Sequence, residues 1–183
     1  SMVITVTALA GSLSAPVPGL ATLPLFLQFV ATMVTTIPAS FIMRRFGRRV
    51  GFIAGALVGG LGGVINVIAL MNNHFILFII GSALIGVQAG FAIYYRFAAA
   101  DSADEDSRPR AISLVLAGGV IAAFTGPNLA RATIDMFPMA SYAGAFAALA
   151  ALQVVAIMLL AFVRIPHLTV EERKERGRPL IEI

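Results

Sequence analysis

The 183-residue chain contains no cysteine, and only 12% of its residues are charged. The absence of cysteine excludes disulfides, thiol nucleophiles and cysteine-based metal sites. Charge is also missing in blocks, since residues 1–43 and 50–95 hold no Asp, Glu, Lys or Arg. A soluble domain carries about 25% charged residues. The shortage of charge therefore argues against an ordinary soluble domain.

Long apolar runs take the place of charge, with 59% hydrophobic residues and a mean hydropathy of +0.93. A run of about 20 apolar residues crosses a bilayer as a helix, which satisfies its own backbone hydrogen bonds. We therefore predict an all-α fold class, a polytopic transmembrane helical bundle over residues 1–165, and a cytoplasmic tail or linker at 166–183. An apolar stub at 2–14, resembling the second half of a truncated first span, precedes expected spans at 20–43, 50–72, 75–98, 111–130 and 140–163.

The basic residues indicate the orientation of these spans. All but one of the 13 fall in loops on one side or follow the last span, and Arg131 alone falls on the opposite side. The positive-inside rule places the basic side in the cytoplasm. We expect an integral membrane protein of the bacterial inner membrane with a cytoplasmic C-terminal tail. If the bundle both begins and ends in the cytoplasm, the number of spans must be even, and six spans satisfy this.

Other classes of function find little support in the sequence. The arginines fall in loops without interleaved aromatic residues, which argues against a nucleic-acid partner. His74 and His167 fall in loops on opposite sides, and no pair of carboxylates lies at membrane depth. No nucleophile with an adjacent base is visible. We expect no enzyme activity, no catalytic residue, no metal and no cofactor, and membrane lipid as a partner.

Glycines recur every four residues in two of the expected spans. Small residues at this spacing allow two helix backbones to approach closely in lipid. Packing within one bundle is favoured over a dimerisation face, because a polytopic protein needs such seams internally. The glycines concerned are Gly51, Gly55, Gly59, Gly63, Gly86 and Gly90.

The basic stretch from Ser40 to Arg49 resembles a loop of the major facilitator superfamily, between its second and third helices. The family pattern is Gly-x-Leu-(small)-Asp-Arg-x-Gly-Arg-Arg. Its last part is matched by Arg45, Gly47, Arg48 and Arg49. Ser40 stands where glycine is usual, and Arg44 stands where the family has an aspartate that helps to latch two halves together. The cation removes the acidic group of that latch.

A second match lies in the span at 111–130. Gly126 and Pro127, followed by Asn128-Leu129-Ala130, resemble the Gly-Pro-x-x-Gly signature of the family. That signature bends a helix near the interface of the halves and is prominent in drug and proton antiporters. A third family motif, with arginine and glutamine in the fourth helix, is absent around Gly86. Together the matches identify the chain as resembling the N-terminal six-helix half of a twelve-span fold.

The resemblance implies transport of a small-molecule substrate by alternating access, as part of a secondary active transporter, with efflux favoured. Arg45, Gly47, Arg48 and Arg49 would form a cytoplasmic gate with Asp101. In related transporters an acidic residue at this helix end pairs with an arginine of the loop. We therefore hypothesise that Asp101 pairs with Arg48 and stabilises the outward-open state. The alternative is a solvated acidic loop.

The partner of this half would be a C-terminal six-helix half or a second copy of the chain. Two other readings stay open, namely a half-size transporter that works as a homodimer and a non-transporting scaffold or truncated remnant. Uncharged polar residues at membrane depth are candidates for lining a cavity, although a hydrogen bond to a neighbouring helix is the favoured interpretation for most of them. These candidates are Gln28, Thr32, Gln88, Tyr95 and Asn128.

Overall fold

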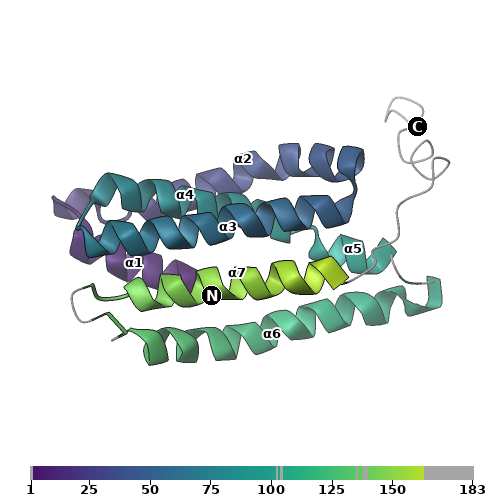
Figure 1. Ribbon diagram of the computed structural model, residues 1–183. Coiled ribbons are helices and arrows are strands. Elements are labelled where there is room, and N and C mark those ends of the chain that lie inside the picture. The colour runs from purple at the N-terminus through teal and green to yellow at the C-terminus, as the bar shows by residue number, and fades with distance from the viewer. Residues whose placement is uncertain (1, 102, 104, 135, 138–139, 163–183) are drawn as a thin grey trace.

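The computed structural model describes residues 2–101, 103, 105–134, 136–137 and 140–162. Within these ranges the chain is helical and has no strand, which confirms the predicted all-α membrane bundle (Figure 1). The predicted tail at 166–183 lies outside the described residues.

Five apolar helical segments are long enough to cross a membrane, and one shorter apolar helix precedes them. Two single 3-10 turns lie between helices, at Pro18–Leu20 (η1) and Glu105–Ser107 (η2). The span expected at 75–98 corresponds to two consecutive helices. The helices are α1 (Met2–Ser14), α2 (Leu23–Phe46), α3 (Arg48–Met71), α4 (Phe75–Ala92), α5 (Tyr95–Asp101), α6 (Arg108–Thr133) and α7 (Ala143–Phe162).

The predicted basic loop is almost entirely helical. Arg44 and Arg45 lie in the last turn of α2, α3 begins at Arg48, and Gly47 alone separates the two helices. Gly47 has a φ of 91°, a conformation that glycine adopts without steric cost. One glycine is therefore enough to reverse the chain between two spans.

The span expected at 75–98 is interrupted between α4 and α5. The N–H of Tyr94 donates to the carbonyl of Phe91, three residues back, at 3.1 Å. Its hydroxyl donates to the carbonyl of Thr36 in α2 at 2.8 Å. Because neither glycine nor proline lies at the break, the sequence carried no local signal for it.

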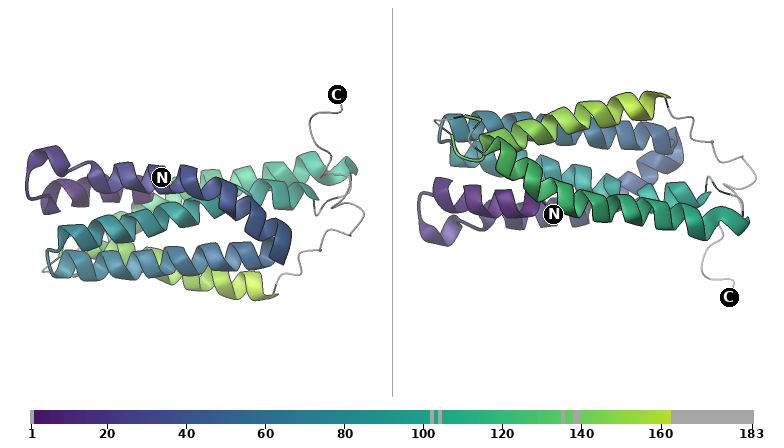
Figure 2. Two further views of the ribbon diagram at one scale, coloured as in Figure 1. Left: turned by 90° about the horizontal axis from the view of Figure 1, so that it is seen from above. Right: turned by 90° about the horizontal axis from the view of Figure 1, so that it is seen from below.

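The helices run along a common direction, with the connections gathered at two ends (Figures 1 and 2). The links from α2 to α3 and from α5 to α6 lie at one end, which we call the Gly47 end. The links from α1 to α2, α3 to α4 and α6 to α7 lie at the other, which we call the Thr22 end. The alternation agrees with the parity of spans that the basic residues predict.

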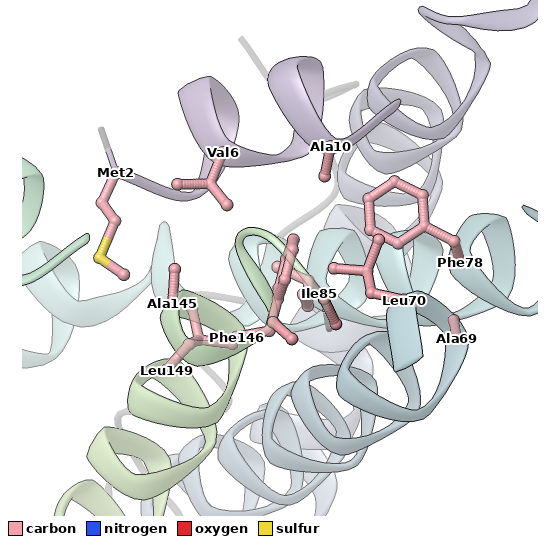
Figure 3. Packing of buried hydrophobic residues seen from close by; sticks show 12 residues of the cluster. Met2, Val6, Ala10, Ala69, Leu70, Phe78, Ile85, Ala145, Phe146 and Leu149 are labelled. Carbon is pink, nitrogen blue, oxygen red and sulfur yellow. The ribbon is translucent and has the colours of Figure 1, made fainter. Parts of the chain in front are cut away.

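Two hydrophobic clusters form the core of the bundle. The larger joins α1, α3, α4 and α7 around the rings of Phe78 and Phe146, whose centroids lie 5.7 Å apart (Figure 3). The second cluster joins α2, α3, α4 and α5 around Met43, Phe52 and Phe91. By contrast, α6 has no buried residue along its whole length.

The glycine seams hold the helices of this chain against one another. A Cβ added at Gly55 would lie 2.7 Å from the Cβ of Phe91 in α4, and one at Gly90 would lie 2.9 Å from the Cβ of Thr35 in α2. Gly63 likewise faces the backbone of α7 at Phe146. The preference for packing within one bundle is confirmed.

Candidate gate and polar seam

Gly47 divides the four arginines of the basic stretch into two pairs with different surroundings. Arg44 and Arg45 are exposed at the C-terminus of α2, where the negative end of the helix dipole favours a cation. Arg48 and Arg49 are half-buried at the N-terminus of α3, where the dipole disfavours a cation. The second pair therefore needs acceptors from other helices.

Arg48 forms an ion pair with Asp101, the last residue of α5. Their side chains are 18% and 16% exposed, so water screens the pair only in part. Arg48 lies at the positive N-terminal end of α3, and Asp101 lies at the negative C-terminal end of α5. Each charge is unfavourable at its own helix end, and the ion pair compensates for both. The structure thus brings together the two residues that the sequence suggested as partners.

Arg49 binds the C-terminus of α7. Its Nε donates to the carbonyl oxygen of Leu160 at 2.9 Å, and its Nη2 donates to that of Ala161. The last carbonyl oxygens of a helix find no N–H donor within the helix, and arginine commonly donates to them instead. The sequence analysis missed this contact, because more than a hundred residues separate its partners and no local pattern marks them.

Gln28 and Thr32 lie in the seam between α2 and α4. The hydroxyl of Thr32 lies 2.9 Å from the carbonyl oxygen of Gln28 and 3.0 Å from that of Gly86, so it links the two helices. Gln28 is buried, and its backbone packs against Gly86. Thr32 therefore links two helices in this conformation, whereas the buried side-chain Oε1 of Gln28 has no hydrogen-bond partner among the described residues.

The other cavity candidates point to different neighbours. Gln88 packs against Gly59 of α3, and the ring of Tyr95 lies 4.5 Å from that of Phe52. Asn128 is exposed on α6 and donates to the carbonyl of Phe124 at 2.9 Å. The five candidates do not converge on one place, and their part in a cavity stays a prediction.

Gly126 and Pro127 lie within α6, which continues as far as Thr133. A Cβ at Gly126 would lie 3.0 Å from the Cβ of Met2 in α1, while Pro127 is exposed. The helix-bending motif therefore lies where α1 meets α6.

A buried polar pair joins α3 to α4, and the sequence analysis did not single it out. The amide nitrogen of Asn66 lies 3.4 Å from the hydroxyl of Ser82, and both side chains are fully buried. Gly81 packs directly against Asn66. An asparagine within an apolar span was the available signal. Among the residues that the structure describes, no group of three His, Cys, Asp or Glu side chains could hold a metal ion.

Five apolar spans, an alternating topology and a charged cluster at one end define an integral membrane helical bundle. The chain belongs to the Major Facilitator Superfamily, whose family model matches residues 1–182.

Curated relatives agree with this assignment. The chain is 39% identical over 184 aligned residues to "Riboflavin transporter RfnT" of Brucella anthropi, an alignment that covers all of this chain and 46% of the relative. It is 34% identical over 125 residues to "Uncharacterized MFS-type transporter YddS" of Bacillus subtilis, covering 66% of this chain and 29% of that protein. The chain thus spans about half the length of the first relative, and its alignment with the second covers a smaller share of that protein. No solved structure matches it significantly.

Proposed function

We propose that this chain is the N-terminal half of a secondary active transporter that moves a small molecule across the bacterial inner membrane. The observation that carries the proposal is the 39% identity to "Riboflavin transporter RfnT", which extends over the whole chain but under half of that protein. The membrane bundle supports it, because a carrier needs a set of packed helices able to move as a unit.

The exposed surface of α6 is where we propose that the second half packs. Gly118 and Gly119 have no atom within 4 Å of an added Cβ, whereas the glycines of α3 and α4 named above are packed against neighbours. Exposed Leu114, Val120 and Phe124 lie on the same helix. Small and apolar residues left open along a span suit a close contact with another helix.

For the mechanism, we propose alternating access in which α3, α5 and α7 move together at the cytoplasmic side. Arg48 joins α3 to α5 and Arg49 joins α3 to α7, so the three helix ends are linked. The Arg48–Asp101 pair then stabilises the outward-open state, in which the cytoplasmic side is closed. Two rigid-body arrangements around a midplane site are how such folds transport.

Riboflavin is the first substrate to test. We would express the native protein that contains this chain in a bacterium that cannot make riboflavin, and follow radiolabelled riboflavin in cells and medium. Accumulation above the empty-vector strain indicates uptake, and faster loss from preloaded cells indicates efflux. No change in either direction, with the protein present in the membrane, would reject riboflavin as the substrate.

The mass of the native gene product separates this proposal from its rivals. We expect a product about twice the 19.2 kDa of this chain, since the chain matches 46% of its relative. A product near 19.2 kDa would instead favour a homodimeric half-transporter or a non-transporting scaffold.

A further inference from the structure

Two buried polar side chains, one on α1 and one on α2, have oxygen atoms without a hydrogen-bond partner. Thr7 is 0% exposed and Gln28 is 6% exposed. Among the residues that the structure describes, the Oγ1 of Thr7 and the Oε1 of Gln28 make no hydrogen bond, so the two side chains are not bonded to each other. Buried polar atoms are rarely left unpaired, because they have given up their bonds to water. The two oxygens therefore indicate a partner from outside these helices.

The contact between α1 and α2 brings these two residues to one seam. A Cβ added at Gly11 of α1 would lie 3.7 Å from the Cγ of Pro24 in α2. Thr7 lies one turn before Gly11, and Gln28 lies one turn after Pro24, each on the same face of its helix as that contact. Because α1 and α2 run in opposite directions from their link at the Thr22 end, both steps lead the same way along the seam (Figure 2). Thr7 and Gln28 therefore face each other one turn deeper in the bundle.

α4 closes this seam from the side of the bundle. The backbone of Gln28 packs against Gly86 of α4, and Val6 of α1 belongs to the same hydrophobic cluster as Ile85 of α4. In the described part of the chain, no hydrogen bond joins α1 to another helix. A ligand can therefore displace α1 from Gln28 without breaking a hydrogen bond between helices.

The chemistry of the two side chains defines the group that they can recognise. Residues 1–43 and 50–95 carry no charge, so recognition at this depth relies on neutral hydrogen bonds. The amide of Gln28 has an acceptor and a donor side by side in one plane, which complement a ring N–H beside a ring carbonyl. The hydroxyl of Thr7 can donate to a second carbonyl. An imide, in which one N–H lies between two carbonyls, offers all three groups.

We propose that Thr7 and Gln28 form a subsite for the imide edge of a planar heterocycle, whose ring N–H donates to the Oε1 of Gln28. The pyrimidinedione ring of riboflavin has such an edge, so the inference rests on the proposed function and deepens it. The two residues then select the substrate, while the Arg48–Asp101 pair belongs to the cytoplasmic gate.

The test compares riboflavin with N3-methylriboflavin, in which a methyl group replaces the imide hydrogen. Titration of the purified native protein, followed by flavin fluorescence, gives the Kd of each. Wild type should bind the methylated analogue roughly 10-fold more weakly, and Q28L should bind riboflavin roughly 5- to 10-fold more weakly and no longer distinguish the two flavins. T7V should bind both several-fold more weakly and still distinguish them. The control Q153L removes a half-buried glutamine of α7, which packs against Gly60 of α3, and should behave as wild type.

The outcomes separate this subsite from the proposed function. If wild type binds both flavins equally, the subsite is wrong and transport of riboflavin still stands; this comparison needs no variant, so it holds even where Q28L does not fold. Full discrimination by Q28L, or an equal loss in Q153L, would also overturn the subsite. If wild type binds neither flavin, riboflavin is rejected as the substrate and the subsite with it.

Discussion

Neighbouring arginines in this chain have different roles because one glycine places them on different helices. Gly47 ends α2 and leaves Arg48 and Arg49 at the N-terminus of α3, where the helix dipole opposes their charge. Asp101 and the terminal carbonyls of α7 compensate for this. Arg44 and Arg45 are already favoured at the C-terminus of α2 and remain free to face lipid or another protein.

Reversing the charges of Arg48 and Asp101 tests the proposed gate. Each single variant, R48D or D101R, should lower transport, because it places two like charges in a half-buried site. The double variant R48D/D101R should recover part of the lost activity. A double-mutant cycle on thermal unfolding should give an interaction energy of about 1–3 kcal/mol.

The two readouts of this cycle distinguish a gate from a structural contact. Recovery of stability without recovery of transport would mean that the pair holds helices together and has no part in gating. Failure of both would show that the two side chains are not partners in the working protein.

At the scale of single helices, glycine determines how closely α3 approaches α4 and α2. The Gly55 and Gly90 contacts leave no room for a side chain, so the helices are in near-backbone contact. In lipid the hydrophobic effect provides no attraction between helices, so close van der Waals packing of this kind holds them together instead. The polar contacts from Thr32 to Gly86 and from Asn66 to Ser82 add directional links at the same seams.

Enlarging Gly55 should destabilise the bundle. In Gly55→Leu the new Cβ would lie 2.7 Å from the Cβ of Phe91, a backbone-proximal atom that cannot move aside freely. We expect a loss of about 1–3 kcal/mol in the free energy of unfolding. Thermal unfolding of the purified native protein would measure it, and Gly19→Ala, in η1, where an added Cβ meets open space, should stay within about 0.5 kcal/mol of wild type.

Enlarging Gly118 tests whether α6 is covered in the complete protein. If a second half packs on α6, Gly118→Leu should abolish or strongly reduce transport while the amount of protein in the membrane stays the same. Val154→Leu, a similar enlargement at an exposed position of α7, is the control and should transport normally. Normal transport by Gly118→Leu would show that α6 faces lipid at this point.

For the whole molecule, the alternation of connections allows a direct test of orientation. Thr22, between η1 and α2, and Ser107, just before α6, are exposed and make no side-chain capping bond. The chain has no cysteine, so Thr22→Cys and Ser107→Cys each introduce a unique thiol into it. A membrane-impermeant maleimide should label the first in intact cells and the second only after the membrane is opened.

The opposite labelling pattern would invert the proposed orientation and place the Arg48–Asp101 pair outside the cell. Labelling of both positions in intact cells would contradict the parity of the spans. Blocking with a permeant maleimide before the assay gives the background for each variant.

The sequence alone determined the class of the protein and the order of its spans. Twenty-residue apolar runs have few stable alternatives in a bilayer, and arginines at their ends indicate which side they face. The same residues carried the family resemblance that the family model now confirms. The pairing of Arg48 with Asp101 was suggested by that resemblance, and the structure places the two side chains together.

The tertiary structure decided which helix each polar or small residue meets. Arg49 reaches α7, Gln88 reaches Gly59, and Tyr95 stacks on Phe52, although none of these pairs is close in sequence. The break between α4 and α5 likewise lies where Tyr94 hydrogen-bonds to α2, and no local breaker in the sequence marks it. A helix that is surrounded by lipid and apolar protein alike is apolar on all sides, so its sequence shows little periodicity. Which side of each helix packs against the bundle therefore depends on the neighbouring helices and cannot be predicted from the helix's own residues.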